Sequence, residues 1–270
     1  MDKKIGFIGL GNMGGAIVIG LIQSKIAKRD QIYAYTHNMD TLRVRVEELG
    51  INLSSSIKDI LEQSDVIFLA IKPQVIEEIL EEIHDYAKPH HIFITMSPGV
   101  SLNYTRAFFN FDAKIVRIMP NTPALIGEGM TGFACASTIS HEEKQVVKKL
   151  LQSFGSVEEV NEELLDAVTA ISGSSPAYVD IFIESLADGG VLLGLPRNLA
   201  YKFAAQAVIG SAKMILETGN HPSELKDSVC SPGGTTIEAV RQLEKHGFRN
   251  AIFEAMIAVD KKSKEMSKNK

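Results

Sequence analysis

Short apolar runs alternate with amphipathic stretches along the chain up to about Asn161. The runs have the length and composition of buried strands, and the stretches between them place apolar residues at the spacing of helices. Strands are predicted at 4–8, 31–35, 51–53, 65–71, 91–95, 114–119, 131–136 and 156–160. Strands that alternate with helices form a mainly parallel sheet covered on both faces. The pattern therefore predicts an α/β fold with a doubly wound sheet.

Beyond Asn161 the predicted strands stop and helices follow one another. They are predicted at 162–171, 177–193, 195–216, 221–227, 235–246 and from about 250. The helix at 177–193 carries only sparse charge, which is typical of a helix buried against a partner. We therefore expect a sheet domain, residues 1–161, and an all-α domain, residues 162–270, through which the chain forms a homodimer. A higher oligomer of such dimers stays open.

The chain has 270 residues, a formal net charge of -5 and a pI of about 5.8. Lysines gather only near the C-terminus, so nothing indicates nucleic-acid binding. No signal-peptide pattern and no apolar run of membrane-spanning length is present, which favours a cytoplasmic protein without a membrane partner. Cys135, Cys230 and the seven histidines lack metal-ligand spacings. We therefore expect free thiols and no metal.

A glycine-rich loop follows the first predicted strand and leads directly into a helical stretch. It reads Gly9-Leu10-Gly11-Asn12-Met13-Gly14. In this context the first glycine makes the tight turn, the second lets the backbone approach a pyrophosphate, and the third lets the helix pack on the strand. We therefore expect a Rossmann-type dinucleotide-binding domain. A purely structural glycine turn is the alternative.

The end of the second predicted strand favours NADPH over NADH. A site specific for NAD usually places Asp or Glu there to bind the ribose 2′-hydroxyl, and that acid would repel a 2′-phosphate. Here Thr36, His37 and Asn38 follow the strand, and the first carboxylate is Asp40. NADH stays the alternative, because Asp40 can still reach the ribose. Four residues that follow other strand ends are also expected to face the nicotinamide: Lys72, Ser97, Gly99 and Asn121.

The stretch Ser231–Val240 has two halves with different backbone preferences. Pro232 and the two glycines exclude regular structure in the first half, whereas Thr235 onward reads as a helix. The junction is a helix N-terminus with free N–H groups and no bulky side chain. Such a terminus suits a small carboxylate or phosphate. The alternative is a glycine-containing cap between two helices.

Several of these segments, taken in order, resemble the pyrroline-5-carboxylate reductase family. The segments are 7–14, 70–74 (Ala-Ile-Lys-Pro-Gln), 117–123 (Arg-Ile-Met-Pro-Asn-Thr-Pro), 172–178 (Ser-Gly-Ser-Ser-Pro-Ala-Tyr) and 231–237. The first motif is shared with many dehydrogenases, and the last three together are specific. The resemblance implies an enzyme that reduces the C=N bond of 1-pyrroline-5-carboxylate with NAD(P)H to give L-proline, the last step of proline biosynthesis. It also implies a Rossmann domain followed by a helical dimerisation domain.

The resemblance also implies site residues. The family's substrate lies between the nicotinamide and the loop that matches 231–236, which comes from the partner subunit. Substrate binding is expected from Ser231, Gly233, Gly234, Thr235 and Thr236, with Ser231 and the N–H groups of Gly234 and Thr235 on the carboxylate. The catalytic candidates are Thr236, beside the imine nitrogen, and Lys72. The cofactor residues are expected to be Gly9, Leu10, Gly11, Asn12, Met13, Gly14, Thr36, His37, Asn38, Asn52, Ala70, Ile71, Lys72, Pro73, Ser97 and Gly99.

Two other functions remain to be weighed. A β-hydroxyacid dehydrogenase shares the N-terminal motif but usually needs a lysine early in its long central helix, and 177–195 contains none. A non-catalytic NADP-binding paralogue is favoured only by Pro98, which stands where the family commonly has a smaller residue. Ser175 and Gly219-Asn220 also depart from the family pattern. We expect these departures to affect rate and substrate breadth more than reaction type.

Overall fold

The computed structural model describes residues 3–267, apart from the side chain of Thr41. The chain divides into two compact units. One runs to Ser174 and includes the chain again from Val259, and the other is Ser175–Ala258. The predicted boundary at residue 161 precedes this division and stays a prediction.

The first unit is built on one sheet of eight strands within the described chain. The order is β3-β2-β1-β4-β5-β6-β7-β8, and all neighbours are parallel except β6 and β7. The strands are β1 (Ile5–Ile8), β2 (Ile32–Tyr35), β3 (Asn52–Leu53), β4 (Val66–Leu69), β5 (Ile92–Thr95), β6 (Lys114–Met119), β7 (Gly129–Cys135) and β8 (Gly155–Glu159). The order reverses at β1, which lies between β2 and β4. The predicted α/β class and doubly wound sheet are confirmed.

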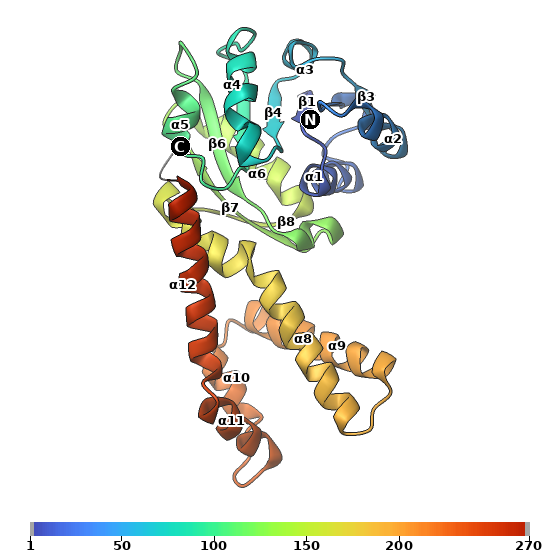
Figure 1. Ribbon diagram of the computed structural model, residues 1–270, viewed down its shortest axis with the longest axis vertical. Helices are drawn as coiled ribbons and strands as arrows, with labels where there is room; N and C mark the ends of the chain where they lie inside the picture. The colour runs from blue at the N-terminus through green and yellow to red at the C-terminus, as the bar shows by residue number, and fades with distance from the viewer. Residues whose placement is uncertain (1–2, 268–270) are drawn as a thin grey trace. The chain divides into compact units, whose positions relative to one another are not determined.

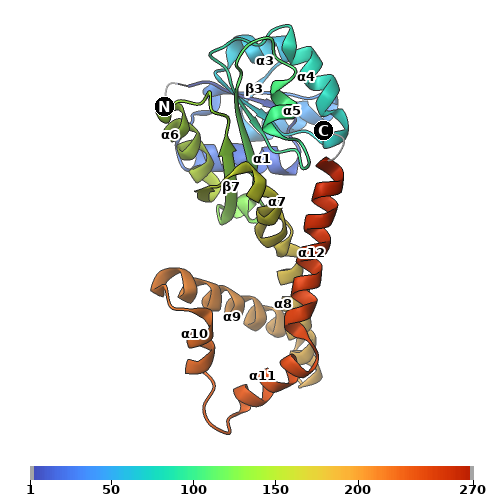
Figure 2. The ribbon, with the colours of Figure 1, turned by 90° about the vertical axis from the view of Figure 1, so that its left-hand side faces the viewer.

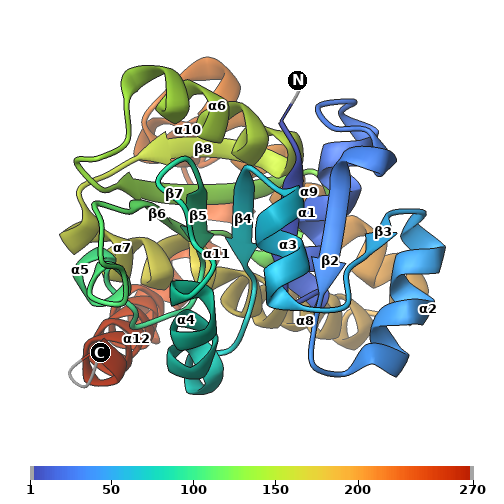
Figure 3. The ribbon, with the colours of Figure 1, turned by 90° about the horizontal axis from the view of Figure 1, so that it is seen from above.

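Helices cover both faces of this sheet (Figure 3). They are α1 (Asn12–Gln23), α2 (Met39–Leu49), α3 (Ile57–Gln63), α4 (Ile76–His84), α5 (Leu102–Arg106), α6 (His141–Leu151) and α7 (Leu165–Val168). One apolar core joins the sheet to α1 and α6, and another joins it to α3 and α4. Central strands such as β4 are buried at every position, because both of their faces pack on helices.

The second unit is all helical (Figures 1 and 2). It contains α8 (Ser175–Leu192), α9 (Arg197–Thr218), α10 (Pro222–Ser228), α11 (Thr235–Lys245) and the start of α12 (Phe248–Ser267). Its buried apolar residues are small: Ala187, Ala200 and Ala204. Large apolar side chains remain exposed on its helices, with Phe203 at 64% and Phe253 at 61%. The second unit therefore does not bury its own apolar faces.

Several local predictions differ from the structure. The predicted helix at 162–171 is a 3-10 turn (Glu162–Leu164), α7, and a π-helical turn (Thr169–Gly173). Helix α8 begins at Ser175, two residues before the predicted start at residue 177. The short helix α5 was not predicted. It begins at Leu102 because the Ser101 hydroxyl accepts the Tyr104 N–H at 3.0 Å, as an N-cap does.

Candidate active site

The glycine loop after β1 has the geometry that its sequence predicts. Gly9 has φ +93°, and its N–H donates to the carbonyl of Tyr35 at 2.8 Å. A β-carbon on Gly9 would overlap the carbonyl of Ala70, and one on Gly14 would lie 2.9 Å from the carbonyl oxygen of Gly9. A β-carbon on Gly11 would meet no atom within 4 Å. The loop is thus closed on the side of β4 and open at Gly11, where a ligand can approach the backbone.

The N-terminus of α1 opens at the same place. Its N-cap is Gly11, which makes no side-chain cap bond, and its first turn carries no acidic residue. The first N–H groups of a helix have no partner within the helix, and the positive end of the helix dipole attracts anions. A pyrophosphate fits this terminus, because nothing on the helix competes for its N–H groups or repels its charge.

A pocket of about 520 Å³ lies beside the loop, at the reversal of strand order where ligands bind in such sheets. It brings together half of the residues expected to bind the cofactor: Gly9, Leu10, Gly11, Thr36, His37, Ala70, Ile71 and Lys72. Ile8, Tyr35, Gln74, Val75 and Ile79 also line it and were missed by the sequence analysis. The remaining expected residues do not line this pocket: Asn12, Met13, Gly14, Asn38, Asn52, Pro73, Ser97 and Gly99.

The end of β2 presents no carboxylate to this pocket. The side chains that line the pocket there belong to Tyr35, Thr36 and His37, and the rings of Tyr35 and His37 meet edge to face at 5.8 Å between centroids. Burial, and after it the charges of Glu82 and Glu78, raise the pKa of the Tyr35 hydroxyl, so it stays neutral. Asp40 lies in the first turn of α2 and does not line the pocket. The pocket therefore offers no acid to repel a 2′-phosphate.

Three polar residues expected near the cofactor are hydrogen-bonded to the protein itself. The amide nitrogen of Asn52 donates to the carbonyls of Asp30 and Ile32, both at 3.0 Å, and so fixes the start of β2. The hydroxyl of Ser97 donates to the carbonyl of Ile71 at 2.9 Å. That bond ties the loop after β5 to the loop after β4.

Asn121 has a similar structural role. Its amide nitrogen donates to the carbonyl of Ser172 at 3.1 Å, and its amide oxygen accepts the N–H of Met130 at 2.8 Å. The first bond holds the π-helical turn before α8, where the wider winding leaves carbonyls that need a donor. Because Asn121 follows the end of β6, it was expected to face the nicotinamide. Instead, its amide nitrogen and its amide oxygen both form hydrogen bonds within the protein.

The junction between α10 and α11 is the second candidate site (Figure 2). Helix α11 begins at Thr235, as predicted, and its N-cap Gly234 makes no side-chain cap bond. Gly233 has φ +67°, and a β-carbon on Gly234 would overlap the hydroxyl of Ser231. Among the described residues, no hydrogen bond engages the hydroxyls of Ser231, Thr235 or Thr236. They surround a helix N-terminus that can receive a carboxylate.

One expected substrate contact, from the Gly234 N–H, does not agree with the structure. The N–H of Gly234 was expected to bind the substrate carboxylate, but it donates to the carbonyl of Ser231 at 3.0 Å and closes the turn. The N–H groups that remain free belong to the first turn of α11, at Thr235 and Thr236. Glu238, the acid in that turn, hydrogen-bonds Arg241 with both of its oxygens. The guanidinium lowers the pKa of the Glu238 carboxyl and offsets its negative charge near the site.

Known proteins match this chain over its whole length. Residues 162–266 match the family described as pyrroline-5-carboxylate reductase dimerisation, and residues 4–99 match that of NADP oxidoreductase coenzyme F420-dependent. The pyrroline-5-carboxylate reductase of Escherichia coli is 47% identical over 269 residues, which cover 100% of each protein. The chain belongs to the pyrroline-5-carboxylate reductase family.

Solved structures of pyrroline-5-carboxylate reductases also superpose along nearly the full length. The enzyme from Coxiella burnetii has a TM-score of 0.91 at 32% identity and covers 99% of this chain and 100% of its own. The pyrroline carboxylate reductase of Plasmodium falciparum, solved with NADP bound, has a TM-score of 0.88 at 33% identity, with 98% of each chain covered. The family resemblance read from the sequence motifs is therefore confirmed, and NAD(P)H is the cofactor class.

An apolar hollow lies in the second unit. Its volume is about 600 Å³, and its lining is drawn from α8, α11 and α12: Tyr178, Ile181, Phe182, Ser185, Leu186, Leu243, Phe248, Ala251, Ile252 and Ala255. Phe182 and Phe248 lie 5.9 Å apart between ring centroids at its wall.

No helix among residues 3–267 is long and apolar enough to cross a membrane. In the same described range, no three His, Cys, Asp or Glu side chains gather as metal ligands.

Proposed function

We propose that this chain reduces 1-pyrroline-5-carboxylate to L-proline with NADPH. The observation that carries the proposal is the full-length match to pyrroline-5-carboxylate reductases, with 47% identity over 269 residues to that of Escherichia coli. The open glycine loop and the uncapped terminus of α1 support a dinucleotide in the first unit. The uncapped terminus of α11, with its unengaged hydroxyls, supports a small carboxylate substrate in the second.

The chemistry needs little from the protein beyond placement and polarity. The bound dinucleotide supplies a hydride, and the protein supplies position and electrostatics. A new C–H bond forms at the imine carbon while the C=N electron pair moves onto nitrogen, which gains a proton. We assign the hydroxyl of Thr236 to that nitrogen as a hydrogen-bond partner and proton relay. The hydroxyl of Ser231 and the N–H groups at the start of α11 hold the carboxylate.

The residues proposed to hold NADPH are those that line the pocket beside β1, with the first turn of α1 on the pyrophosphate. Thr36 and His37 are assigned to the ribose 2′-phosphate, because no acid accompanies them in the pocket. Lys72 is exposed at the pocket edge and is assigned to the nicotinamide side, as a cation that attracts an anionic substrate.

We further propose that the working molecule is a homodimer formed through the second unit. The exposed apolar side chains of α8, α9 and α12 form more apolar surface than a monomer in water normally exposes. The apolar hollow between α8, α11 and α12 would receive side chains of a second copy. An obligate interface of this kind buries roughly 2,000 Å² or more.

The reaction is tested by following the hydride with an isotope. Purified protein is given 1-pyrroline-5-carboxylate and NADPH deuterated at either face of nicotinamide C4. We expect L-proline with one deuterium on the ring carbon that formed the C=N bond, from one of the two labelled forms. Oxidation of hydroxyacids with NADP, in place of imine reduction, would instead indicate a β-hydroxyacid dehydrogenase. NADPH binding without turnover would indicate a non-catalytic paralogue.

A further inference from the structure

Arg117 is a buried cation in the sheet of the first unit. It lies in β6 and is 5% exposed. Its side chain shares a face of the sheet with Ile115 and Met119, which belong to an apolar cluster with Leu102 and Leu165. A charge in such a place must be paired, because removing it from water is costly. The partners of Arg117 therefore indicate which segments of the chain are fixed against the sheet at this point.

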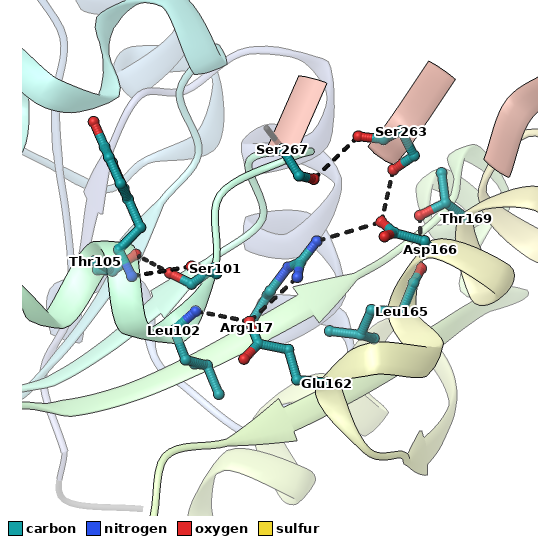
Figure 4. A network of polar contacts seen from close by, with 11 residues as sticks. Ser101, Leu102, Thr105, Arg117, Glu162, Leu165, Asp166, Thr169, Ser263 and Ser267 are labelled. Atoms are coloured by element: carbon teal, nitrogen blue, oxygen red, sulfur yellow. Dashed lines mark hydrogen bonds and ion pairs between the residues drawn. The ribbon is translucent and has the colours of Figure 1, made fainter. Parts of the chain in front are cut away.

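Two carboxylates pair with Arg117, both from the segment that follows the sheet (Figure 4). Its Nη1 lies 3.2 Å from Oε1 of Glu162, and its Nη2 lies 3.7 Å from Oδ1 of Asp166. The guanidinium thus holds Glu162 and Asp166 in place at the beginning of α7. We name Arg117, Glu162, Asp166 and Ser263 the Arg117 cluster.

Glu162 connects this cluster to the loop after β5. Its Oε1, the oxygen beside Arg117, also accepts the backbone N–H of Leu102 at 2.7 Å. Leu102 is the first residue of α5, and the loop Ser97–Ser101 runs directly into it. Within this loop the N–H of Val100 donates to the carbonyl of Ser97. One carboxylate oxygen therefore anchors the loop at its C-terminal end.

Asp166 connects the cluster to the end of α12. The hydroxyl of Ser263 donates to its Oδ1 at 2.7 Å, and Ser263 is 5% exposed (Figure 4). One turn later, the backbone of Met266 packs on Gly99, where an added β-carbon would lie 3.0 Å from the Met266 carbonyl carbon. Gly99 has φ +75°, so its bend is one that other residues rarely adopt. The end of α12 thus covers the middle of the same loop.

We propose that Arg117 is a positioning residue for the loop Ser97–Ser101, acting through Glu162 at one end of the loop and through Asp166, Ser263 and Met266 at its middle. The inference rests on the proposed function in one respect, namely the expectation from the sequence that Ser97 and Gly99 of this loop face the nicotinamide, although neither lines the pocket beside β1. The hydroxyl bond from Ser97 to the carbonyl of Ile71 carries that placement to the loop beside Lys72. A loop held in this way binds the nicotinamide at a smaller entropic cost than a loop that must first become ordered.

The mildest test removes only the bond between α12 and Asp166. Ser263→Ala deletes that hydroxyl, and Ser267→Ala is the matched control, because the Ser267 hydroxyl donates only to the Ser263 carbonyl of its own helix. We expect Ser263→Ala to raise the NADPH dissociation constant about threefold to tenfold. It should also speed hydrogen exchange in peptides covering 97–102 relative to the rest of the sheet. Ser267→Ala should leave both close to wild type. Equal behaviour of the two variants in both measurements would overturn the proposal.

A second pair of variants tests the cation itself. Arg117→Lys keeps a positive charge between the carboxylates, whereas Arg117→Met leaves them unpaired. We expect NADPH affinity to fall in the order wild type, Arg117→Lys, Arg117→Met. A purely structural role would lower the melting temperature in both variants without changing exchange at 97–102 below the transition. Wild-type protein that fails to reduce 1-pyrroline-5-carboxylate would contradict the proposed function, and the exchange measurement would still decide whether the Arg117 cluster holds the loop.

Discussion

The carbonyl group of Ala70 lies against Gly9 so closely that a β-carbon on Gly9 would be 2.9 Å from its carbon and nearer still to its oxygen. Gly9 also has φ +93°, which side chains rarely adopt. Gly11, two residues later in the same loop, is free of both constraints, because its φ is -72° and an added β-carbon would meet no atom within 4 Å. Glycine is therefore required at position 9 by the fold, whereas at position 11 it leaves room for a ligand.

This contrast predicts opposite effects of the same substitution. Gly9→Ala should lower the free energy of unfolding by more than about 2 kcal/mol, since backbone strain adds to a clash with backbone atoms. Gly11→Ala should leave the melting temperature nearly unchanged but weaken NADPH binding by about tenfold or more, because its methyl group occupies the pyrophosphate approach. Thermal unfolding and NADPH titration of both variants separate these effects. Normal NADPH affinity in Gly11→Ala would contradict the placement of the pyrophosphate.

Cofactor choice should depend on the charge at the end of β2. Thr36→Asp adds a carboxylate to a pocket wall that has none there, and it should reduce kcat/KM for NADPH by about tenfold or more through repulsion of the 2′-phosphate. NADH carries no such phosphate and should be affected far less. Thr36→Asn, of similar size but neutral, is the control. The ratio of kcat/KM for the two cofactors is the measurement, and wild type should favour NADPH. An NADH preference in wild type would show that the strand end was misread.

His91 predicts a loss of stability in mild acid. It is fully buried immediately before β5, and its Nδ1 accepts the N–H of Lys88 at 3.1 Å. Burial, with the nearby charge of His90, lowers the pKa of the imidazole from 6.5 to about 4. The folded state keeps the ring neutral while the unfolded state takes up a proton, so stability falls as pH drops from about 6.5 to about 4. At about 1.4 kcal/mol for each pKa unit, His91 accounts for at most about 3.5 kcal/mol of that loss.

Denaturant unfolding between pH 7 and pH 4 measures this effect. His91→Gln, which removes the titrating ring, should flatten the dependence of unfolding free energy on pH in that window. His90→Gln removes only the smaller contribution of the His90 charge to the His91 pKa, so it should reduce the slope much less than His91→Gln does. Identical slopes for His91→Gln and wild type would show that another group controls acid stability.

The sequence predicted the order of elements well, because burial on both faces gives each central strand a continuous apolar run. It did not predict that β7 runs antiparallel to β6, since strand direction depends on pairing between distant segments. The π-helical turn before α8 was also missed. Its stabilising bond comes from Asn121, 51 residues away from Ser172.

The candidate site shows the same division between local and distant information. The glycine loop and the start of α11 were predictable because glycine and proline restrict or free the backbone at their own positions. The engagement of Asn52, Ser97 and the Gly234 N–H was not, because each bonds a backbone group that only the folded chain brings near. Arg117 begins one of the family motifs, but its pairing was not predictable, because its partners are distant in sequence and Asp166 in turn bonds Ser263, 97 residues further along the chain.

The exposed apolar surface of the second unit predicts that a single charge there will separate the subunits. Ile181 is 63% exposed on α8 and lines the apolar hollow. Ile181→Asp should produce monomer at micromolar concentration, because a buried, unpaired carboxylate is costly at an interface. Asp180→Asn, at an exposed polar neighbour, should remain dimeric like wild type. Sedimentation velocity distinguishes the species, and a wild-type monomer with full activity would refute the dimer.

The assignment of the substrate to the N-terminus of α11 makes Thr236 the residue that matters most. Its hydroxyl makes no hydrogen bond within the described chain, and the N-cap Gly234 has no side-chain cap bond, so a capping role finds no support in the geometry. Thr236→Val keeps the shape and branching of the side chain and removes only the donor. The substitution should therefore leave the stability of α11 unchanged and affect only the rate of the reaction.

The decisive measurement is kcat and melting temperature on this one variant, with NADPH affinity as the internal control. Loss of a hydrogen bond worth about 1–3 kcal/mol predicts a fall in kcat of roughly 5- to 150-fold. The fall in kcat should exceed any rise in KM, because the hydroxyl acts on the nitrogen as charge develops there. The melting temperature and the NADPH dissociation constant should stay near wild type. A lower melting temperature, corresponding to a loss of about 1 kcal/mol in the free energy of unfolding, with kcat unchanged, would contradict the catalytic role of Thr236. It would mean that Thr236 only stabilises α11.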